Sequence, residues 1–135
     1  MKYLIFLLFP LLLVSCKKDE GPTPSGSLQV LTAQSFQSEV KDGTGISVVF
    51  FHAEWCTICH AQRPHIEEAA EDADLSAAFF GEIDNVDYES VFDAEGVSYF
   101  PQIWIYEDGE FKKEITSQNQ PITTAEIKQV VLDYL

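Results

Sequence analysis

The chain has 135 residues, and 22 acidic side chains stand against 8 basic ones, which gives a formal net charge of −14. This charge repels phosphate backbones and anionic lipid headgroups, so it argues against nucleic acid as a partner and against electrostatic adhesion to a membrane. The length suffices for one domain with a substantial hydrophobic core and is too short for two.

The first 15 residues have the pattern of a lipoprotein signal peptide. Lys2 precedes an apolar stretch over residues 3–14, which is shorter than the roughly 20 apolar residues of a membrane-spanning helix. The small residues before Cys16 resemble the site cut by the lipoprotein signal peptidase, and this resemblance implies that Cys16 carries the lipid. We therefore expect a protein of the bacterial cell envelope, lipid-anchored to a membrane and facing the periplasm or the cell surface. An ordinary cleaved signal that leaves a spare thiol is the alternative.

Residues 16–27 follow as a tether. After Cys16 they combine charged residues with Gly, Pro and Ser, a composition typical of a solvated linker. Residues 28–135 remain as the folded domain.

The domain begins with short apolar runs that alternate with helical periods. We expect a strand over residues 28–31 and then a helix capped by Thr32, with Phe36 and Val40 facing inward. Residues 47–52 are almost continuously apolar, as expected of a central strand covered on both faces.

A second helix starts at Cys56, and Pro64 within it is expected to cause a kink because proline lacks an N–H and clashes with the preceding turn. Residues 78–84 then form the next strand. Asp87 is expected to cap a short helix that stops at Gly96.

The C-terminal segment, residues 101–135, is predicted to form a hairpin and then a helix. Strands over residues 101–106 and 110–116 are joined by a turn at 108–109, and the spacing of Thr123 and Glu126 fits a capping box. The buried stripe of that final helix is Ile127, Val130, Val131 and Tyr134. The predicted order is βαβαβαββα.

The tetrapeptide Cys56-Thr57-Ile58-Cys59 lies between the central strand and its helix. Positions i and i+3 share a helix face, so the two sulfurs are close enough to form or open a disulfide. The first thiol lies among unpaired N–H groups at the helix start, where a thiolate is favoured. If Cys16 carries lipid, these two cysteines can pair only with each other or with a partner's sulfur.

This order and motif together resemble the thioredoxin family across residues 28–135. Residues 51–56 are similar to the passage from strand to active site, Cys56 and Cys59 match the two redox cysteines, and Pro64 matches the helix proline. The resemblance implies an α/β thioredoxin fold with a central mixed β-sheet flanked by helices.

The resemblance also implies a mechanism. Cys56 forms a mixed disulfide with a substrate protein, and Cys59 resolves it. Pro101 matches the family's cis-proline, which lies beside the sulfurs. The backbone of Phe100 is then expected to bind extended peptide, and Trp55 to pack beside the motif.

Two positions depart from the family. Its buried aspartate, six residues before the first cysteine, is Phe50 here, and its nearby lysine aligns with Phe80. Activation of Cys59 would then need Glu54, a histidine or water as the proton acceptor. Residues 57–58 contain neither proline nor histidine, and we expect a reductant or an isomerase.

Three alternatives remain. Residues 56–60 also match the attachment motif of c-type haem, with His60 as one axial ligand and His52 or His65 as the other. Both cysteines with His60 or His65 are a possible zinc or copper site. The third alternative is a partner-binding domain whose disulfide is only structural.

We therefore expect a membrane-anchored thiol-disulfide oxidoreductase that acts on protein thiols and disulfides of the envelope and exchanges electrons with a redox partner protein. No cofactor and no metal are expected, and the protein is expected to be a monomer.

Overall fold

The computed structural model describes residues 27–115, 117 and 119–135. The predicted signal peptide, Cys16 and the tether up to residue 26 lie outside the described residues.

Five strands form one mixed sheet in the order β1-β3-β2-β4-β5. Strands β1 and β2 both run parallel to β3, whereas β4 runs antiparallel to β2 and to β5. The mixed sheet expected from the family resemblance is confirmed. The strands are β1 (Gln29–Val30), β2 (Ile46–His52), β3 (Phe79–Asp84), β4 (Gln102–Glu107) and β5 (Glu110–Glu114).

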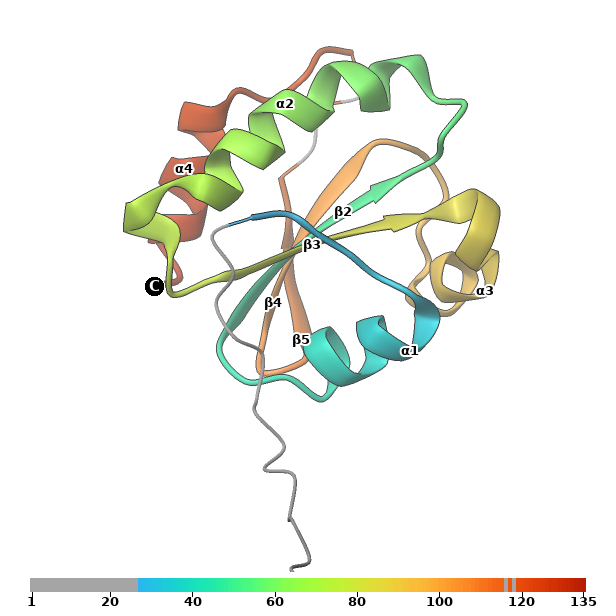
Figure 1. The fold of residues 1–135 in the computed structure, drawn as a ribbon, viewed down its shortest axis with the longest axis horizontal. Coiled ribbons are helices and arrows are strands. Elements are labelled where there is room, and N and C mark those ends of the chain that lie inside the picture. The colour runs from blue at the N-terminus through green and yellow to red at the C-terminus, as the bar shows by residue number, and fades with distance from the viewer. Residues whose placement is uncertain (1–26, 116, 118) are drawn as a thin grey trace, which may run out of the picture.

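Helices cover both faces of this sheet (Figure 1). Helices α2 and α4 lie side by side on one face, and α1 and α3 lie on the other. The predicted element order is confirmed, with a π-helical segment, η1, continuing α1 and a 3₁₀ turn, η2, following α2. The bounds are α1 (Ala33–Ser35), η1 (Phe36–Lys41), α2 (Thr57–Glu71), η2 (Ala73–Leu75), α3 (Asn85–Glu95) and α4 (Thr124–Leu132).

Strand β2 lies between two hydrophobic cores, one on each face of the sheet. Every residue of β2 is therefore buried. Side chains alternate between the two faces of a strand. Val48 and Phe50 therefore join the core beneath α2 and α4, while Val49 and Phe51 join the core beneath α1 and α3. The predicted central strand is confirmed, and its end leads directly to the cysteines at the start of α2.

Capping boxes start two helices where the sequence predicted caps. Thr32 Oγ1 accepts a hydrogen bond from the Ser35 N–H at 3.1 Å, and Ser35 Oγ accepts one from the Thr32 N–H at 2.8 Å. Thr123 and Glu126 make the same reciprocal pair at the start of α4. Each box satisfies N–H groups that the first helical turn leaves without partners.

Helix α3 begins earlier than predicted. Asp84, not Asp87, is its N-cap, and Asp84 Oδ1 accepts a hydrogen bond from the Val86 N–H at 2.8 Å. The backbone of Tyr88 is non-helical, with φ −133° and ψ 42°, so the apolar pattern near Asp87 marks only the second part of the helix. Gly96 ends α3 with φ 81°, as its position predicted.

Strands β4 and β5 form the predicted hairpin. Asp108 and Gly109 have φ values of 51° and 80°, which a two-residue hairpin turn of the primed type requires. Strand β5 ends at Glu114, short of the predicted end at residue 116, which lies outside the described residues.

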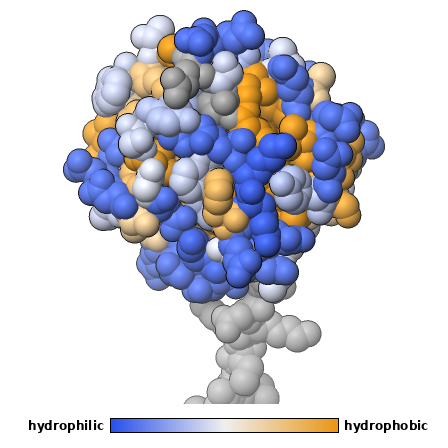
Figure 2. Space-filling model, turned by 180° about the vertical axis from the view of Figure 1, so that it is seen from behind, coloured by the Kyte–Doolittle hydropathy of each residue, from blue (hydrophilic) through white to orange (hydrophobic). Residues whose placement is uncertain are grey.

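Within the described ranges, no helix combines the length and hydrophobicity needed to cross a membrane. Figure 2 shows one face of the molecule covered mostly by hydrophilic side chains, with hydrophobic side chains gathered in separate patches. This surface agrees with the acidic composition of the chain.

Candidate active site

Cys56 and Cys59 form a disulfide at the start of α2. Cys56 is the N-cap residue, its Sγ accepts a hydrogen bond from the Cys59 N–H at 3.2 Å, and the two Cα atoms are 5.2 Å apart. Cys59 is 3% exposed and Cys56 is 7% exposed. The pair can thus form the bond that its spacing predicted, and Cys56 is the slightly more exposed of the two buried residues.

The turn that leads into the disulfide is held by its own backbone and by a histidine. The Cys56 N–H donates to the Ala53 carbonyl at 3.0 Å. His60 Nε2 lies 2.7 Å from the Glu54 carbonyl oxygen, a hydrogen bond that requires the proton on Nε2. His60 therefore fastens the turn from the first part of α2, and the helix continues past Pro64 to Glu71.

The Phe100-Pro101 peptide bond is cis, as the family resemblance implied. Pro101 is buried, and Phe100 is half-buried. The Phe100 ring makes edge contacts with Trp55 at 6.0 Å and with Phe92 at 5.2 Å between ring centroids. Trp55 is 71% exposed, so most of its indole ring faces solvent.

Gln102 supports the loop that contains Pro101, a role that no sequence pattern indicated. Its side chain is buried, Nε2 donates to the Tyr99 carbonyl at 3.0 Å, and Oε1 accepts from Trp104 Nε1 at 2.6 Å. The amide thereby links the backbone before Pro101 to strand β4.

Phe50 and Phe80 are fully buried in the core that contains both cysteines. No carboxylate or ammonium group therefore occupies those two positions. Glu54 is exposed, and its described contact is made by the backbone carbonyl, not by the carboxylate.

A cluster of charged and titratable side chains lies under α2, on the same face of the sheet as the disulfide. We call His52, Arg63, Glu82 and Asp84 the His52 cluster. Arg63 forms a direct ion pair with Glu82, and His52 Nε2 lies 3.4 Å from Glu82 Oε2 while its Nδ1 lies 3.8 Å from Asp84 Oδ2. Burial, and then the charge of Arg63, lower the pKa of His52 from 6.5 to about 4. Burial raises the pKa of Glu82 against the opposing effect of Arg63.

Of this cluster, only His52 was predicted from the sequence to have a role, as an alternative haem ligand. One signal was available, because Glu82 interrupts the apolar run of residues 79–83, and a buried acid needs a cationic partner. Arg63 is the only arginine of the chain.

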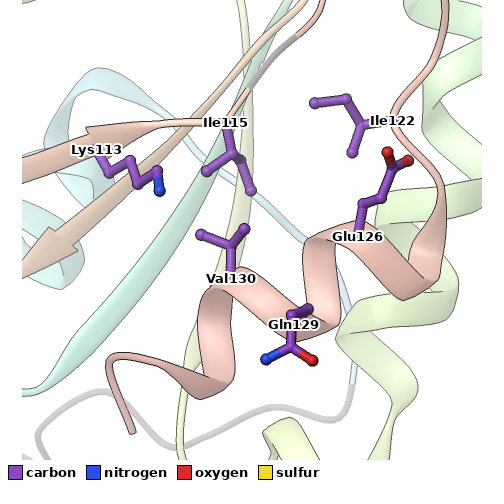
Figure 3. Close-up of a pocket in the computed structure, with 6 residues that line it drawn as sticks. All are labelled: Lys113, Ile115, Ile122, Glu126, Gln129 and Val130. Carbon is purple, nitrogen blue, oxygen red and sulfur yellow. The ribbon is translucent and has the colours of Figure 1, made fainter.

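A cavity of about 340 Å³ lies apart from these residues, between the end of β5 and α4. Figure 3 shows Ile115, Ile122 and Val130 pointing toward it, with Glu126 and Gln129 along its α4 side. None of its lining residues belongs to the predicted site.

The haem and metal alternatives receive no support from the fold. The haem alternative required both sulfurs in thioether bonds and a small helical fold, whereas the described chain has a five-stranded sheet and a Cys56–Cys59 bond. His65 lies 3.4 Å from Thr124 Oγ1 on α4. Across the described ranges, no three His, Cys, Asp or Glu side chains gather as a metal site would need.

Comparisons with known proteins agree with this geometry. The family model described as Thioredoxin matches residues 27–132. A thioredoxin of Acetoanaerobium sticklandii is 31% identical over 105 residues, which cover 78% of this chain and 97% of that protein. Mouse protein disulfide-isomerase A5 is 33% identical over 96 residues, 68% of this chain and 17% of that protein. A mutant thioredoxin of Halobacterium salinarum NRC-1 has a similar fold, with a TM-score of 0.71, 22% identity, and coverage of 84% of this chain and 96% of that one.

Proposed function

This chain belongs to the thioredoxin family and is a thiol-disulfide oxidoreductase. We propose that it is a lipid-anchored enzyme of the bacterial cell envelope. There it exchanges disulfides with envelope proteins, as a reductant or an isomerase. The observation that carries the chemistry is the Cys56–Cys59 disulfide at the N-terminus of α2. The anchor and the location are supported by the sequence of residues 1–27 alone.

Reduction of a substrate begins at Cys56. Its thiolate attacks one sulfur of the substrate disulfide, so that a bond forms between Cys56 Sγ and that sulfur while the substrate's own S–S bond breaks and the second sulfur leaves as a thiolate. The N–H of Cys59, which donates to Cys56 Sγ at 3.2 Å, and the positive end of the α2 dipole both favour the attacking anion.

Cys59 completes the exchange. After losing its proton, its sulfur attacks Cys56 Sγ, the bond between Cys56 and the substrate breaks, and the substrate leaves with both electrons on its sulfur. The enzyme then carries the Cys56–Cys59 disulfide, and a partner protein must supply two electrons to reduce it again. Isomerisation follows the same first step and ends when a second substrate thiol displaces Cys56.

The substrate surface is formed by exposed apolar side chains beside the disulfide. Trp55 is 71% exposed, Ile58 is 39% exposed, and the half-buried Phe100 contacts the Trp55 ring. Such a surface fits an extended or unfolded segment that presents a disulfide with neighbouring apolar residues. We expect the backbone of Phe100, beside the cis-proline, to pair with that segment.

The thiol chemistry is tested by trapping. We expect the Cys59→Ala protein, expressed with its signal, to accumulate mixed disulfides that a dithiol releases, whereas Cys56→Ala should accumulate none. Equal amounts of trapped protein in both variants would contradict the assigned order of attack. A potential of the pair near about −270 mV indicates a reductant, and a value near about −120 mV indicates an oxidant and would overturn the proposed direction.

The anchor is tested separately. The wild-type protein should fractionate with membranes and carry an acylated N-terminal cysteine in mass spectra, and Cys16→Ser should release it to the soluble fraction. If the wild type is found unacylated and soluble, the proposed location is wrong while the thiol chemistry stands.

A further inference from the structure

The resolving cysteine needs a proton acceptor. Cys59 must be a thiolate to attack the mixed disulfide, but burial in an apolar core disfavours a charged sulfur. Cys59 is 3% exposed, and Phe50 and Phe80 in the same core carry no titratable group. The proton must therefore pass to another side chain or to water.

Three titratable side chains other than the cysteines are buried in the part of the chain that the structure describes: His52, Glu82 and Tyr106. Tyr106 belongs to the core on the opposite face of the sheet, and its hydroxyl donates to Glu95 at 2.8 Å. Only His52 and Glu82 remain as buried acceptors on the face that carries the cysteines.

Strand register places His52 next to the cysteine core. Its ring stacks on Phe50, with 5.0 Å between centroids and 23° between planes, and Phe50 shares a core with both cysteines. Glu82 pairs with Phe50, and Asp84 pairs with His52, in the parallel ladder of β2 and β3. All of these side chains therefore lie on one face of the sheet.

Arg63 connects this face to the resolving cysteine. It lies four residues after Cys59 on α2, which puts both side chains on the same side of the helix. Its guanidinium is 5.8 Å from the centroid of the Phe50 ring and forms the ion pair with Glu82. Arg63, one helical turn after Cys59, therefore joins the His52 cluster to the helix that carries the resolving cysteine.

The carboxylates in and beside the His52 cluster outnumber its one permanent cation, Arg63, so a second positive charge would be stabilised there. Arg63 compensates one of the two carboxylates, Glu82 and Asp84, and Glu67 on α2 adds a further anion 3.7 Å from Arg63. His52 Nδ1 faces Asp84, whereas Nε2 lies 3.4 Å from Glu82 Oε2 and 3.5 Å from Arg63 Nη2. The two carboxylates would therefore stabilise an imidazolium against the opposing charge of Arg63. His60, which also acts to lower the pKa of His52, is held at the exposed turn by the Glu54 carbonyl.

We propose that His52 accepts the proton of the Cys59 thiol when Cys59 attacks the mixed disulfide, and that Glu82 and Asp84 stabilise the resulting imidazolium. The inference rests on the proposed function, because it concerns the resolving step. The S–H bond of Cys59 breaks, the proton goes to an imidazole nitrogen, and the sulfur's electron pair forms the Cys56–Cys59 bond. The bond between Cys56 and the substrate breaks, and the departing thiolate takes its proton from the imidazolium or from water.

The lowered pKa of His52 in the oxidised protein, about 4, keeps the imidazole neutral near neutral pH, so it is able to accept a proton, but it also makes the imidazole a weak base. Proton transfer from Cys59 therefore requires that the imidazolium be stabilised when the thiolate forms. A thiolate on the same face of the sheet would favour the imidazolium, so protonation of His52 and ionisation of Cys59 should promote each other.

A two-phase reaction of the full reduced chain with dithiobis-nitrobenzoate tests the proposal. The first phase forms the mixed disulfide on Cys56, and the second, in which Cys59 expels the coloured thiol, is the resolving step. We expect His52→Phe, which keeps an aromatic ring on Phe50, to leave the first phase unchanged, to slow the second by about tenfold, and to move its pH midpoint upward by about one unit. The matched control is His65→Gln, on the same helix as the cysteines, which should alter neither phase.

An unchanged second phase in a folded His52→Phe protein overturns the proposal. If that variant does not fold, the wild type still decides: the His52 imidazole resonances should titrate at a higher pH in the reduced protein than in the oxidised one, and equal midpoints overturn the proposal. A missing first phase would instead contradict the proposed function, so the two failures are distinguishable.

Discussion

The side-chain amide of Gln62 forms two hydrogen bonds with the backbone of Ile122. Gln62 Nε2 donates to the Ile122 carbonyl at 2.9 Å, and Gln62 Oε1 accepts from the Ile122 N–H at 2.8 Å. Gln62 is fully buried on α2, and Ile122 lies just before α4. This single side chain therefore fastens the helix that carries the cysteines to the segment that leads into the last helix.

We expect Gln62→Leu to lower the free energy of unfolding by about 2–4 kcal/mol, because the Ile122 carbonyl and N–H both lose their partner in a partly buried place. Denaturant unfolding of the oxidised protein measures the loss. The same substitution at the exposed Gln34 of α1 should change stability by less than about 0.5 kcal/mol. A similar effect at both positions would show that the paired hydrogen bonds contribute little.

The buried face of α2 shows what hydropathy can and cannot predict. Apolar Ile58 is 39% exposed and Ala61 is exposed, whereas polar Gln62 is fully buried. The helix itself was predictable from the spacing of its apolar residues. The buried amide was not, because its partners are backbone atoms 60 residues away.

The candidate site also contains residues that could be predicted from the sequence and residues that could not. Cys56, Cys59 and Pro101 were predictable because a local motif and one proline identify them without any knowledge of packing. The ion pair between Arg63 and Glu82 depends on how α2 lies over β3, and this is not set by either segment alone. The early start of α3 was missed for a local reason: Asp84 ends the strand and caps the helix at once, a double role that apolar periodicity does not reveal.

His52 should make the oxidised protein less stable in mild acid. Its pKa is lowered from 6.5 to about 4, so between these values the unfolded chain binds a proton that the folded chain does not. The stabilisation is complete above about pH 6.5 and is lost as pH falls toward 4, with a total on the order of 3 kcal/mol.

The raised pKa of Glu82 acts in the opposite sense, because it costs stability as pH rises above 4.5. The comparison must therefore be made between variants at each pH. We expect the wild type to lose more stability than His52→Phe between neutral pH and pH 4, as measured by denaturant unfolding. Parallel losses in the two proteins would contradict the assignment to His52.

Two glycines with the same backbone conformation should respond differently to alanine. Gly96 and Gly109 have φ values of 81° and 80°, a region that costs an alanine about 1 kcal/mol. An ideal Cβ at Gly96 meets no atom within 4 Å, whereas one at Gly109 lies 2.0 Å from the Lys41 carbonyl oxygen.

Gly96→Ala should therefore lose about 1 kcal/mol, and Gly109→Ala should lose at least about 2 kcal/mol more, because the hairpin turn must move away from Lys41. Thermal and denaturant unfolding of the two variants provide the comparison. Equal losses would mean that the turn relaxes freely and that its contact with Lys41 is unimportant.

Trp55 should matter for protein substrates and hardly at all for small ones. Its ring is 71% exposed and rests against Phe100, so its removal leaves little core unfilled, but it takes away the largest apolar surface beside the disulfide. We expect Trp55→Ala to raise KM for a disulfide-containing protein by about tenfold, as loss of an aromatic anchor does at an interface. The rate with a small dithiol should stay within about twofold, because that reagent needs only the sulfurs.

Leu135→Ala, which shortens an exposed apolar side chain at the end of the chain, is the matched control and should change neither rate. A Trp55→Ala protein that loses activity equally on both substrates would show that the ring acts on the cysteines themselves and not on the bound chain.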